Sequence, residues 1–544
     1  MQISKLGHRF VMALVKTLVI ALLVLPWIHA YTAGPIPNAW PWMIAMACAL
    51  VCLLLVWTTA DKLDPSSTPH LLSAPPDSSQ FIAMAWLLAA MISSAIGLVQ
   101  YFDAASGFTD WLSQTENPGE AFGNLRQRNQ YASLTSIGLA AALGWVGLQQ
   151  GRISFWLAAG VVLLALGSAA SNSRTGLLQW LLLPALAWMW VWASRSRKFA
   201  ESRHSPVALR LAWLATAALL AYGLAVLLLP RVLGWVMGVD AGGLWGRLGE
   251  QAGCSSRWIL WANVLALIAE KPWFGWGWGQ LDYAHFIHLY EGPRFCEILD
   301  NAHNLPLHLA VELGVPAALL LCAGALWAVL RCKPWAETDP VRQMAWSMLA
   351  VIALHSLVEY PLWYGPFQLA VGLAVLLLWQ NRSKTAENSY FQASNVPKTQ
   401  QTPGRAAIIL IAAKASILVA LGVLTYGGWE YQRISQIYLP PAQRSEAMRE
   451  HTLEKIGHSW LFEDTLAFAE LSITPLSPQN AAHIHTLAVS LLAYSPEAMV
   501  VEKIIESAAM LGRENDALFY LQRYRAAYPE AYARWSASLK DASR

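Results

Sequence analysis

The sequence predicts an all-α protein that crosses a membrane about eleven times, and three observations support this. Only 13% of the 544 residues are charged, against about a quarter in soluble domains. The 28 tryptophans are of a residue type that gathers at membrane–water interfaces. Apolar runs of about 20 residues, enough to cross a bilayer, recur along the chain. The eleven predicted spans are approximately residues 10–30, 40–59, 80–100, 131–149, 154–170, 176–193, 208–229, 304–330, 343–359, 364–380 and 406–427.

The N-terminal segment is interpreted as the first of these spans and not as a cleaved signal peptide. Lys5 and Arg9 precede an apolar run that reaches about Ala30. No clear small-residue cleavage site follows this run, and further hydrophobic spans come after it.

The distribution of lysine and arginine predicts the orientation in the membrane. The even-numbered connections are basic, for example around Arg195–Lys198, Arg331–Arg342 and Arg382–Arg405. The short loops 31–39 and 360–363, on the opposite side, contain no lysine or arginine. The positive-inside rule therefore places the N-terminus in the cytoplasm. With eleven spans, we expect a multi-pass protein of the bacterial inner membrane whose C-terminal region lies in the periplasm.

The same spans divide the chain into four regions. Residues 1–230 hold spans one to seven, 231–303 form a large periplasmic segment, 304–427 hold spans eight to eleven, and 428–544 form a periplasmic helical domain. The C-terminal region has the composition of a soluble protein, and residues 511–529 resemble one tetratricopeptide-like helix pair.

The large periplasmic segment contains apolar features that are too short to span. The run Trp258–Ala269 has about twelve residues, which favours an interfacial or re-entrant helix. Four aromatic residues follow, and we expect them to form a belt on the bilayer surface; they are Trp273, Phe274, Trp276 and Trp278.

Candidate chemistry lies in four polar clusters on the predicted periplasmic face, where ionisable residues next to a bilayer are costly. For the arginines in these clusters, a purely structural interpretation stays open: a solvated loop, a topology signal or contact with lipid headgroups. The clusters are Gly123–Gln130, Ser171–Gly176, Cys254–Arg257 and Asp300–Pro306, and the segment His355–Tyr364 lies at the same face.

His303 is the candidate base. Asn304 suits a helix N-cap and Pro306 a first helical turn, so His303 would lie at the positive end of a helix. Such an end attracts anions and disfavours imidazolium, and a neutral imidazole can serve as a general base. The alternative is a histidine satisfied by a backbone carbonyl. His308 and Glu312, four residues apart on one helix, are interpreted as a structural pair.

Several of these motifs resemble a known family. His303-Asn304 followed by Glu312-x-Gly314 resembles the signature of the O-antigen ligase superfamily. The stretches Leu125–Gln130, Ser173–Gly176 and His355–Pro361 resemble the protein O-oligosaccharyltransferase branch, the pilin-glycosylase type. The resemblance covers about residues 80–380 and extends to the C-terminal region. Arg128 departs from it, because a proline is expected there.

The resemblance implies a glycosyltransferase C-type membrane fold that works without a metal or another cofactor. It also implies a glycan donor linked to undecaprenyl pyrophosphate and an acceptor serine or threonine of a pilin or other exported protein. Carried over residue by residue, it implies catalytic roles for His303, Gln127 and Tyr360, pyrophosphate binding by Arg174, Arg257 and Arg126, and supporting roles for Asn129, Asn304, Glu312, His355 and Glu359. The net charge of +3 gives no reason to expect a nucleic-acid partner.

Two other functions remain open from the sequence. A ligase or polymerase that builds O-antigen on lipopolysaccharide would share the fold and the donor, although a periplasmic domain favours a protein acceptor. A non-catalytic glycolipid transporter would be expected to place charged sites near the bilayer midplane. Here the charged groups gather at one face instead.

A disulfide between Cys254 and Cys296 is also predicted. Of the six cysteines, these two are the ones assigned to the oxidising periplasm, where thiols tend to pair. Two free thiols are the alternative, since a bridge requires Cα atoms within about 7 Å.

Overall fold

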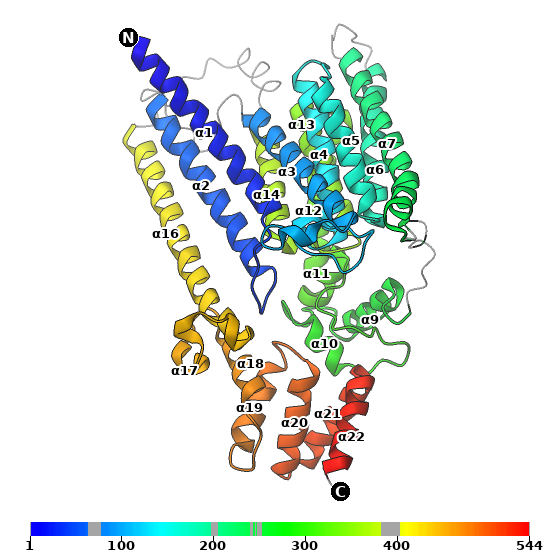
Figure 1. Cartoon of the computed structure of the whole chain (residues 1–544), viewed down its shortest axis with the longest axis vertical. Helices are drawn as coiled ribbons and strands as arrows, with labels where there is room; N and C mark the ends of the chain where they lie inside the picture. The colour runs from blue at the N-terminus through cyan, green and yellow to red at the C-terminus, as the bar shows by residue number, and fades with distance from the viewer. Residues whose placement is uncertain are drawn as a thin grey trace.

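The computed structural model describes residues 2–63, 78–196, 205–239, 243–244, 246, 253–381 and 403–542. Throughout these ranges the regular secondary structure is helical. Long helices run up and down side by side, and a smaller group of helices lies beyond one end of them (Figure 1). The N-terminus lies at the far end of the long helices, and the C-terminus lies in the smaller group.

The predicted hydrophobic spans coincide with long helices. Seven of the described helices are long and apolar enough to cross a membrane, so the protein is polytopic. Four further apolar segments are shorter, namely Ala13–Ile28, Phe155–Ala170, Gly365–Gln380 and Ala481–Leu491, and the count of eleven crossings therefore stays a prediction. The long helices are α1 (Gln2–Ile28), α2 (Ala39–Leu63), α3 (Ser78–Tyr101), α4 (Arg128–Leu148), α5 (Phe155–Ala170), α6 (Arg174–Ser196), α7 (Ser205–Met237), α12 (Val315–Cys332), α13 (Pro340–Ser356), α14 (Gly365–Gln380) and α16 (Pro403–Ser435).

Helix α4 is the centre of the bundle. It packs against α3, α5, α6, α7 and α13, and 89% of the residues in its most apolar stretch are buried. Small residues allow this close packing: a Cβ added at Gly138 would lie 2.3 Å from the Cβ of Ala90. The surrounding helices therefore fix where the N-terminal end of α4 lies.

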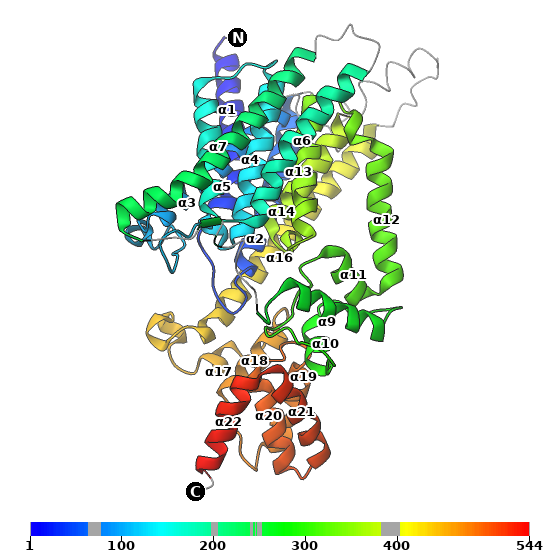
Figure 2. The ribbon, with the colours of Figure 1, turned by 90° about the vertical axis from the view of Figure 1, so that its right-hand side faces the viewer.

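The predicted span 304–330 is wrong as a single helix. It consists of α11 (Leu305–Leu313) and α12, separated at Gly314, whose φ is +88°. A Cβ at this position would lie 2.2 Å from the carbonyl oxygen of Trp273. The amide of Val315 donates to the oxygen of Pro272 over 2.8 Å. Hydropathy does not reveal such a backbone break, which leaves α11 beyond the end of α12 (Figure 2).

The aromatic segment after α9 (Arg257–Glu270) faces outward at three of its four positions. Trp273, Phe274 and Trp278 are 71%, 90% and 61% exposed. The ammonium of Lys271 lies 3.8 Å from the ring centre of Trp276. This exposure fits the expected interfacial belt.

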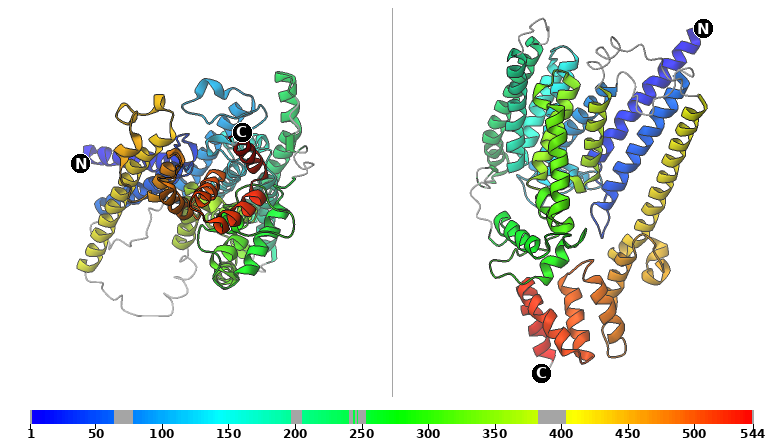
Figure 3. Two further views of the ribbon diagram at one scale, coloured as in Figure 1. Left: turned by 90° about the horizontal axis from the view of Figure 1, so that it is seen from below. Right: turned by 180° about the vertical axis from the view of Figure 1, so that it is seen from behind.

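The C-terminal helices dock onto α10 (Leu281–Ile287). Phe286 of α10 is part of their apolar core, which includes Leu491 and Ile504, and Arg523 donates to the oxygen of Ile287 over 2.8 Å. Figure 3 shows α16 leading from the long helices to this group. Its helices are α17 (Thr452–Ile456), α18 (Glu463–Ile473), α19 (Ala481–Leu491), α20 (Ala498–Met510), α21 (Glu514–Ala527) and α22 (Pro529–Ala542). The tetratricopeptide-like repeat stays a prediction.

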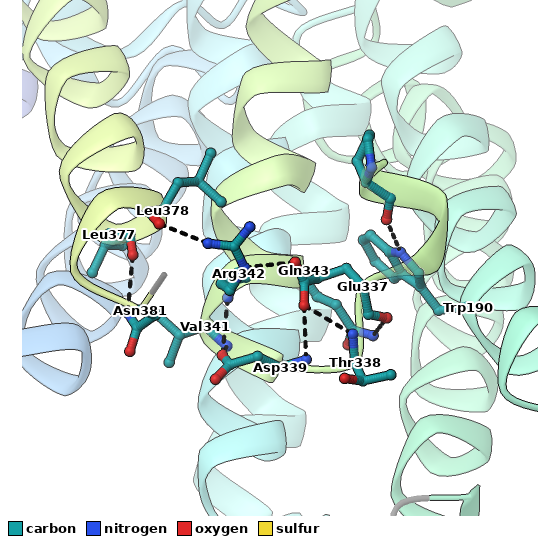
Figure 4. Close-up of polar contacts among 11 residues, drawn as sticks. Trp190, Glu337, Thr338, Asp339, Val341, Arg342, Gln343, Leu377, Leu378 and Asn381 are labelled. Atoms are coloured by element: carbon teal, nitrogen blue, oxygen red, sulfur yellow. Dashed lines mark hydrogen bonds and ion pairs between the residues drawn. The ribbon is translucent and has the colours of Figure 1, made fainter. Parts of the chain in front are cut away.

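Polar contacts tie the connection between α12 and α13 to its neighbours (Figure 4). This connection lies at the end of the bundle that carries the N-terminus (Figure 2). Arg342 donates to Glu337 and to the oxygen of Leu378, each over 2.6 Å. Asp339 caps α13 by accepting from two backbone amides. Trp190 of α6 donates to the oxygen of Pro334 over 2.7 Å. This is the face that the basic residues assign to the cytoplasm.

The orientation can be tested with reporter fusions. A reporter placed at Ser389, outside the described residues, should report the cytoplasm, because Ser389 lies in the basic connection Arg382–Arg405 and basic loops favour the cytoplasmic side. A reporter placed at Ala531 of α22 should report the periplasm. Alkaline phosphatase and green fluorescent protein fusions at both positions give opposite readouts in each compartment. Finding both positions on the same side would refute the predicted topology.

Candidate functional site

The carboxylate of Glu359 joins three of the predicted site residues. One oxygen, Oε2, lies 2.8 Å from Nδ1 of His303. The other, Oε1, accepts from Nη2 of Arg257 and, over 3.2 Å, from Nδ2 of Asn129. Burial alone would raise the pKa of Glu359, but the hydrogen bond and charge of His303 and the charge of Arg257 together lower the pKa below its ordinary value. The carboxylate is therefore ionised at neutral pH.

The turn after α13 positions Glu359. The backbone amides of Val358 and Glu359 both donate to the oxygen of His355, over 3.0 and 2.9 Å. His355 itself is fully buried, and its Nδ1 lies 2.8 Å from Oγ of Ser133. His355 thus shapes the turn from the interior of the bundle and does not join the carboxylate cluster.

The backbone at His303 adopts an uncommon conformation. Its φ of +49° lies in the left-handed region, which costs energy for a residue other than glycine and often marks functional sites. Its amide donates to Oδ1 of Asn301 over 2.9 Å. Asn304 caps α11 by accepting from Leu307 and donates to the oxygen of Leu357 over 3.0 Å. These bonds hold the start of α11 against the turn that carries Glu359.

Four helix N-termini meet at this cluster. Asn129 lies in the first turn of α4, and its Oδ1 accepts from Oγ of Ser173 over 2.6 Å. Ser173 also accepts from the amide of Gly176 over 2.9 Å at the start of α6. Ser256 caps α9, and Asn304 caps α11. Helix N-termini carry partial positive charge and favour bound anions, so the cluster is suited to an anionic group.

Two arginines occupy the first positions of two of these helices. Arg174 begins α6 and is exposed, and Arg257 begins α9 with a side chain that is 41% exposed. Arg257 uses Nη2 for Glu359, whereas a guanidinium carries five N–H donors. The geometry therefore leaves donors of Arg257 that can bind phosphate oxygens in pairs.

Tyr360 links His303 to a neighbouring cavity. Its ring meets the imidazole edge-on with 4.9 Å between ring centres, and it stacks on Tyr364 at 5.9 Å. Burial raises the pKa of both phenols, which keeps them protonated. Tyr364 and Gln127 both line a cavity of about 260 Å³ at the ends of α1, α2, α4 and α14.

Gln127 and Arg126 lie outside the Glu359 cluster. The Gln127 side chain caps α4, accepting from the amide of Gln130 over 2.6 Å, and faces the cavity. Arg126 donates to Oγ of Ser113 over 3.1 Å and to the oxygen of Ala30. The φ of +60° at Arg126 reverses the chain just before α4. This reversal separates Arg126 from Asn129, although the two are close in sequence.

Glu312 also lies apart from the cluster, in a pair with His308. The pair distance is 3.4 Å, and the side chains are 1% and 2% exposed. Burial raises the pKa of Glu312 to about 7 and lowers that of His308 to about 4, so both are uncharged between these values. The ring of His308 meets that of Trp363 edge-on at 4.7 Å. This packing fits the structural interpretation of the pair.

The structure joins Cys254 and Cys296 in a disulfide with a Cα–Cα distance of 5.5 Å. Such a distance is within the usual range for a bridge. Cys254 precedes Arg257 by three residues, so the bond lies next to the beginning of α9.

Thiol labelling should detect this bond in the protein from an oxidising membrane. In a variant that keeps only Cys254 and Cys296, we expect no alkylation without reductant and two alkylated cysteines after reduction and unfolding. Intact-mass measurement counts the labels. Complete labelling of both residues in the unreduced, unfolded protein would exclude the bridge.

A buried polar network beneath the cluster was not anticipated from the sequence. Nε2 of Gln179 in α6 donates to Ser133 of α4 over 2.7 Å, and Ser136 donates to Oε1 of Gln179 over 3.1 Å. Ser133 in turn contacts His355. A glutamine inside an apolar span is costly, and this signal could have identified Gln179.

Three family models match successive parts of the chain. Residues 121–145 match a model described as "Protein glycosylation ligase", and residues 159–322 match one described as "O-Antigen ligase". Residues 343–542 match a model described as "Virulence factor membrane-bound polymerase, C-terminal". The first two matches include Asn129, Arg174, Arg257 and His303, and the third includes Glu359.

Two curated proteins of Acinetobacter baylyi are similar to the chain. A "General O-oligosaccharyltransferase" is 24% identical over 310 residues, which are 55% of this chain and 50% of that protein. A "ComP-specific O-oligosaccharyltransferase" is 28% identical over 141 residues, 26% of this chain and 25% of that protein. The chain thus spans half the length of the first relative and a quarter of the second.

Proposed function

We propose that this chain is a protein O-oligosaccharyltransferase of the O-antigen ligase superfamily, a proposal that its family matches and curated relatives support. In this proposal it transfers a glycan from undecaprenyl pyrophosphate to a serine or threonine hydroxyl of a pilin or another exported protein. One observation carries the proposal. An ionised carboxylate, Glu359, binds a candidate base and a candidate pyrophosphate ligand at the same time. A transferase of this kind needs the base on one side of the reacting carbon and the pyrophosphate ligand on the other side.

His303 acts as the general base in this proposal. The ionised Glu359 accepts a hydrogen bond from the Nδ1–H of His303. With the proton assigned to Nδ1, Nε2 carries the free lone pair. The imidazole side chain is 21% exposed, so an acceptor hydroxyl can reach it. The carboxylate of Glu359 thus orients and polarises the base His303, as in a catalytic triad, and the substrate hydroxyl is the nucleophile.

Transfer is a direct displacement at the anomeric carbon. The acceptor oxygen forms the new bond to this carbon while its proton passes to Nε2 of His303. The bond from the carbon to the pyrophosphate oxygen breaks, and the leaving group keeps the electron pair. Arg257, Arg174 and the N-termini of α6 and α9 stabilise the growing negative charge, the type of contribution that is usually largest in such reactions.

The acceptor would approach from the side of the C-terminal helices. These helices dock onto α10 through Phe286 and Arg523, close in sequence to the segment that carries His303. We place this face in the periplasm and the N-terminus in the cytoplasm, on the basis of the lysine and arginine distribution. The lipid tail of the donor would lie against bilayer-facing helices.

A second candidate is polymerisation or ligation of O-antigen, which the polymerase description of the model matched by residues 343–542 favours. Co-expression with a lipid-linked glycan pathway and candidate pilins separates the two. We expect the intact mass of a pilin to rise by the mass of the glycan. An unchanged pilin together with a longer or newly capped lipopolysaccharide would favour the second candidate.

A further inference from the structure

The cavity at the ends of α1, α2, α4 and α14 is a polar site that the displacement described above does not use. Its volume is about 260 Å³. Polar side chains from four segments line it: His29, Tyr31, Asn38, Gln127, Gln130 and Tyr364. These groups offer amide, imidazole and phenol donors and acceptors within one partly open cavity.

Two polar atoms of the cavity residues lack a protein partner within the described part of the chain. They are Oε1 of Gln130 and Nδ1 of His29. Gln130 is only 2% exposed. Buried polar atoms are nearly always hydrogen-bonded, and each exception calls for an explanation such as a bound molecule. Both residues line the cavity, but neither atom is accessible to solvent, so a ligand would satisfy them only after these side chains turn toward the cavity.

The cavity adjoins the reacting groups. Tyr364 in its wall stacks on Tyr360, whose ring meets that of His303. Gln127 in its wall caps α4, two residues before Asn129, which binds Glu359. A molecule held in the cavity would therefore be separated from the base by the rings of Tyr364 and Tyr360.

The lining indicates which part of a donor would fit. A lipid tail would leave the amides and the imidazole unsatisfied, which is costly. A pyrophosphate would need several cationic donors, but the described lining contains a single arginine, Arg126, two of whose nitrogens already donate to Ser113 and Ala30. A sugar ring has hydroxyl groups for the amides and apolar faces for the tyrosines. The volume suits about one ring and not a whole oligosaccharide, given that a single water occupies about 30 Å³ in the liquid.

We propose that this cavity binds the sugar that is bonded directly to the pyrophosphate of the donor, through hydrogen bonds between its hydroxyl groups and the side chains of Gln127, Gln130 and His29. The inference rests on the proposed glycan-transfer function and adds a specificity site to it. In this arrangement the anomeric carbon lies between the cavity and the helix N-termini that hold the pyrophosphate.

Binding of two short donor analogues to the purified full-length protein tests the proposal. One probe is farnesyl pyrophosphate, and the other carries a single N-acetylhexosamine on the same pyrophosphate. We expect the wild type to bind the sugar-bearing probe about tenfold more tightly, a difference of about 1.4 kcal/mol. Gln130→Met keeps the length of the side chain but removes the amide, and should abolish most of this preference with an unchanged Kd for farnesyl pyrophosphate.

Matched variants complete the experiment. Gln149→Met, at the opposite end of α4, should keep the full preference. Arg257→Lys should weaken both probes by similar factors, because it alters the pyrophosphate contact. If Gln130→Met does not give a folded protein, His29→Phe removes the second unpartnered atom and carries the same expectation.

The outcomes distinguish a failure of the proposed sugar site from a failure of the proposed transfer function. An equal affinity of the wild type for both probes, or a full sugar preference in Gln130→Met and His29→Phe, would overturn the sugar site. A loss of farnesyl pyrophosphate binding in these two variants would show that the cavity holds the pyrophosphate or the lipid instead. If the wild type binds neither probe, the proposed transfer function itself is wrong.

Discussion

Replacing His303 by alanine should reduce glycan transfer by about 10²–10⁴-fold, the range typical for loss of a general base. Without the imidazole, the acceptor hydroxyl has no group to take its proton as the bond to the anomeric carbon forms. The ratio of glycosylated to unmodified acceptor, measured by intact mass in cells and as an initial rate with purified protein, provides the readout. Donor-analogue binding should persist, because Arg174 and Arg257 are unchanged.

The matched control is His483→Ala, which removes an exposed histidine that is also paired with a glutamate, Glu470, over 3.1 Å. It should transfer glycan as the wild type does. Near-normal transfer by the His303 variant, at equal protein level in the membrane, would exclude this residue as the base.

The second large effect is expected for Glu359→Gln, with a loss of transfer of roughly 10²-fold or more. Glutamine has the same size, but its neutral amide cannot accept from both His303 and Arg257, since one of its two groups is a donor. The imidazole then loses the negative charge that fixes its tautomer and stabilises its protonated form. Glu359→Asp keeps the charge and should retain more activity than the glutamine variant. Rates of transfer by all three proteins decide this order.

Glu337→Gln is the control for this prediction. Glu337 also binds an arginine, Arg342, over 2.6 Å (Figure 4). This pair lies at the start of α13, whereas Glu359 follows its end. It should leave transfer within about twofold of wild type, because Glu337 lies far from the reacting groups and glutamine keeps an oxygen that can accept from the amides of Thr338 and Asp339. A Glu359→Gln protein with wild-type rates would show that the carboxylate only supports the fold.

Much of the architecture could be predicted from local patterns. Each apolar run marks a helix because the bilayer requires about 20 apolar residues and internally satisfied backbone groups. The His303-Asn304 start of α11 was readable because helix caps use few residue types. Glu359 could be assigned a supporting role, but its position as the common partner of His303, Arg257 and Asn129 could not, since these residues are up to 230 positions apart.

The sequence by itself determined the helical membrane class, the separation of basic and non-basic faces, and the set of polar residues that gather at one face, because these follow from hydropathy and local composition. Tertiary structure alone decided which of these polar residues join the Glu359 cluster and which line the neighbouring cavity. Backbone conformations at Arg126, His303 and Gly314, with φ of +60°, +49° and +88°, turn neighbouring side chains toward different partners. Arg126 and Gln127 consequently line a cavity, whereas Asn129 joins the carboxylate cluster. Such turns depend on long-range packing, which the order of residue types does not specify.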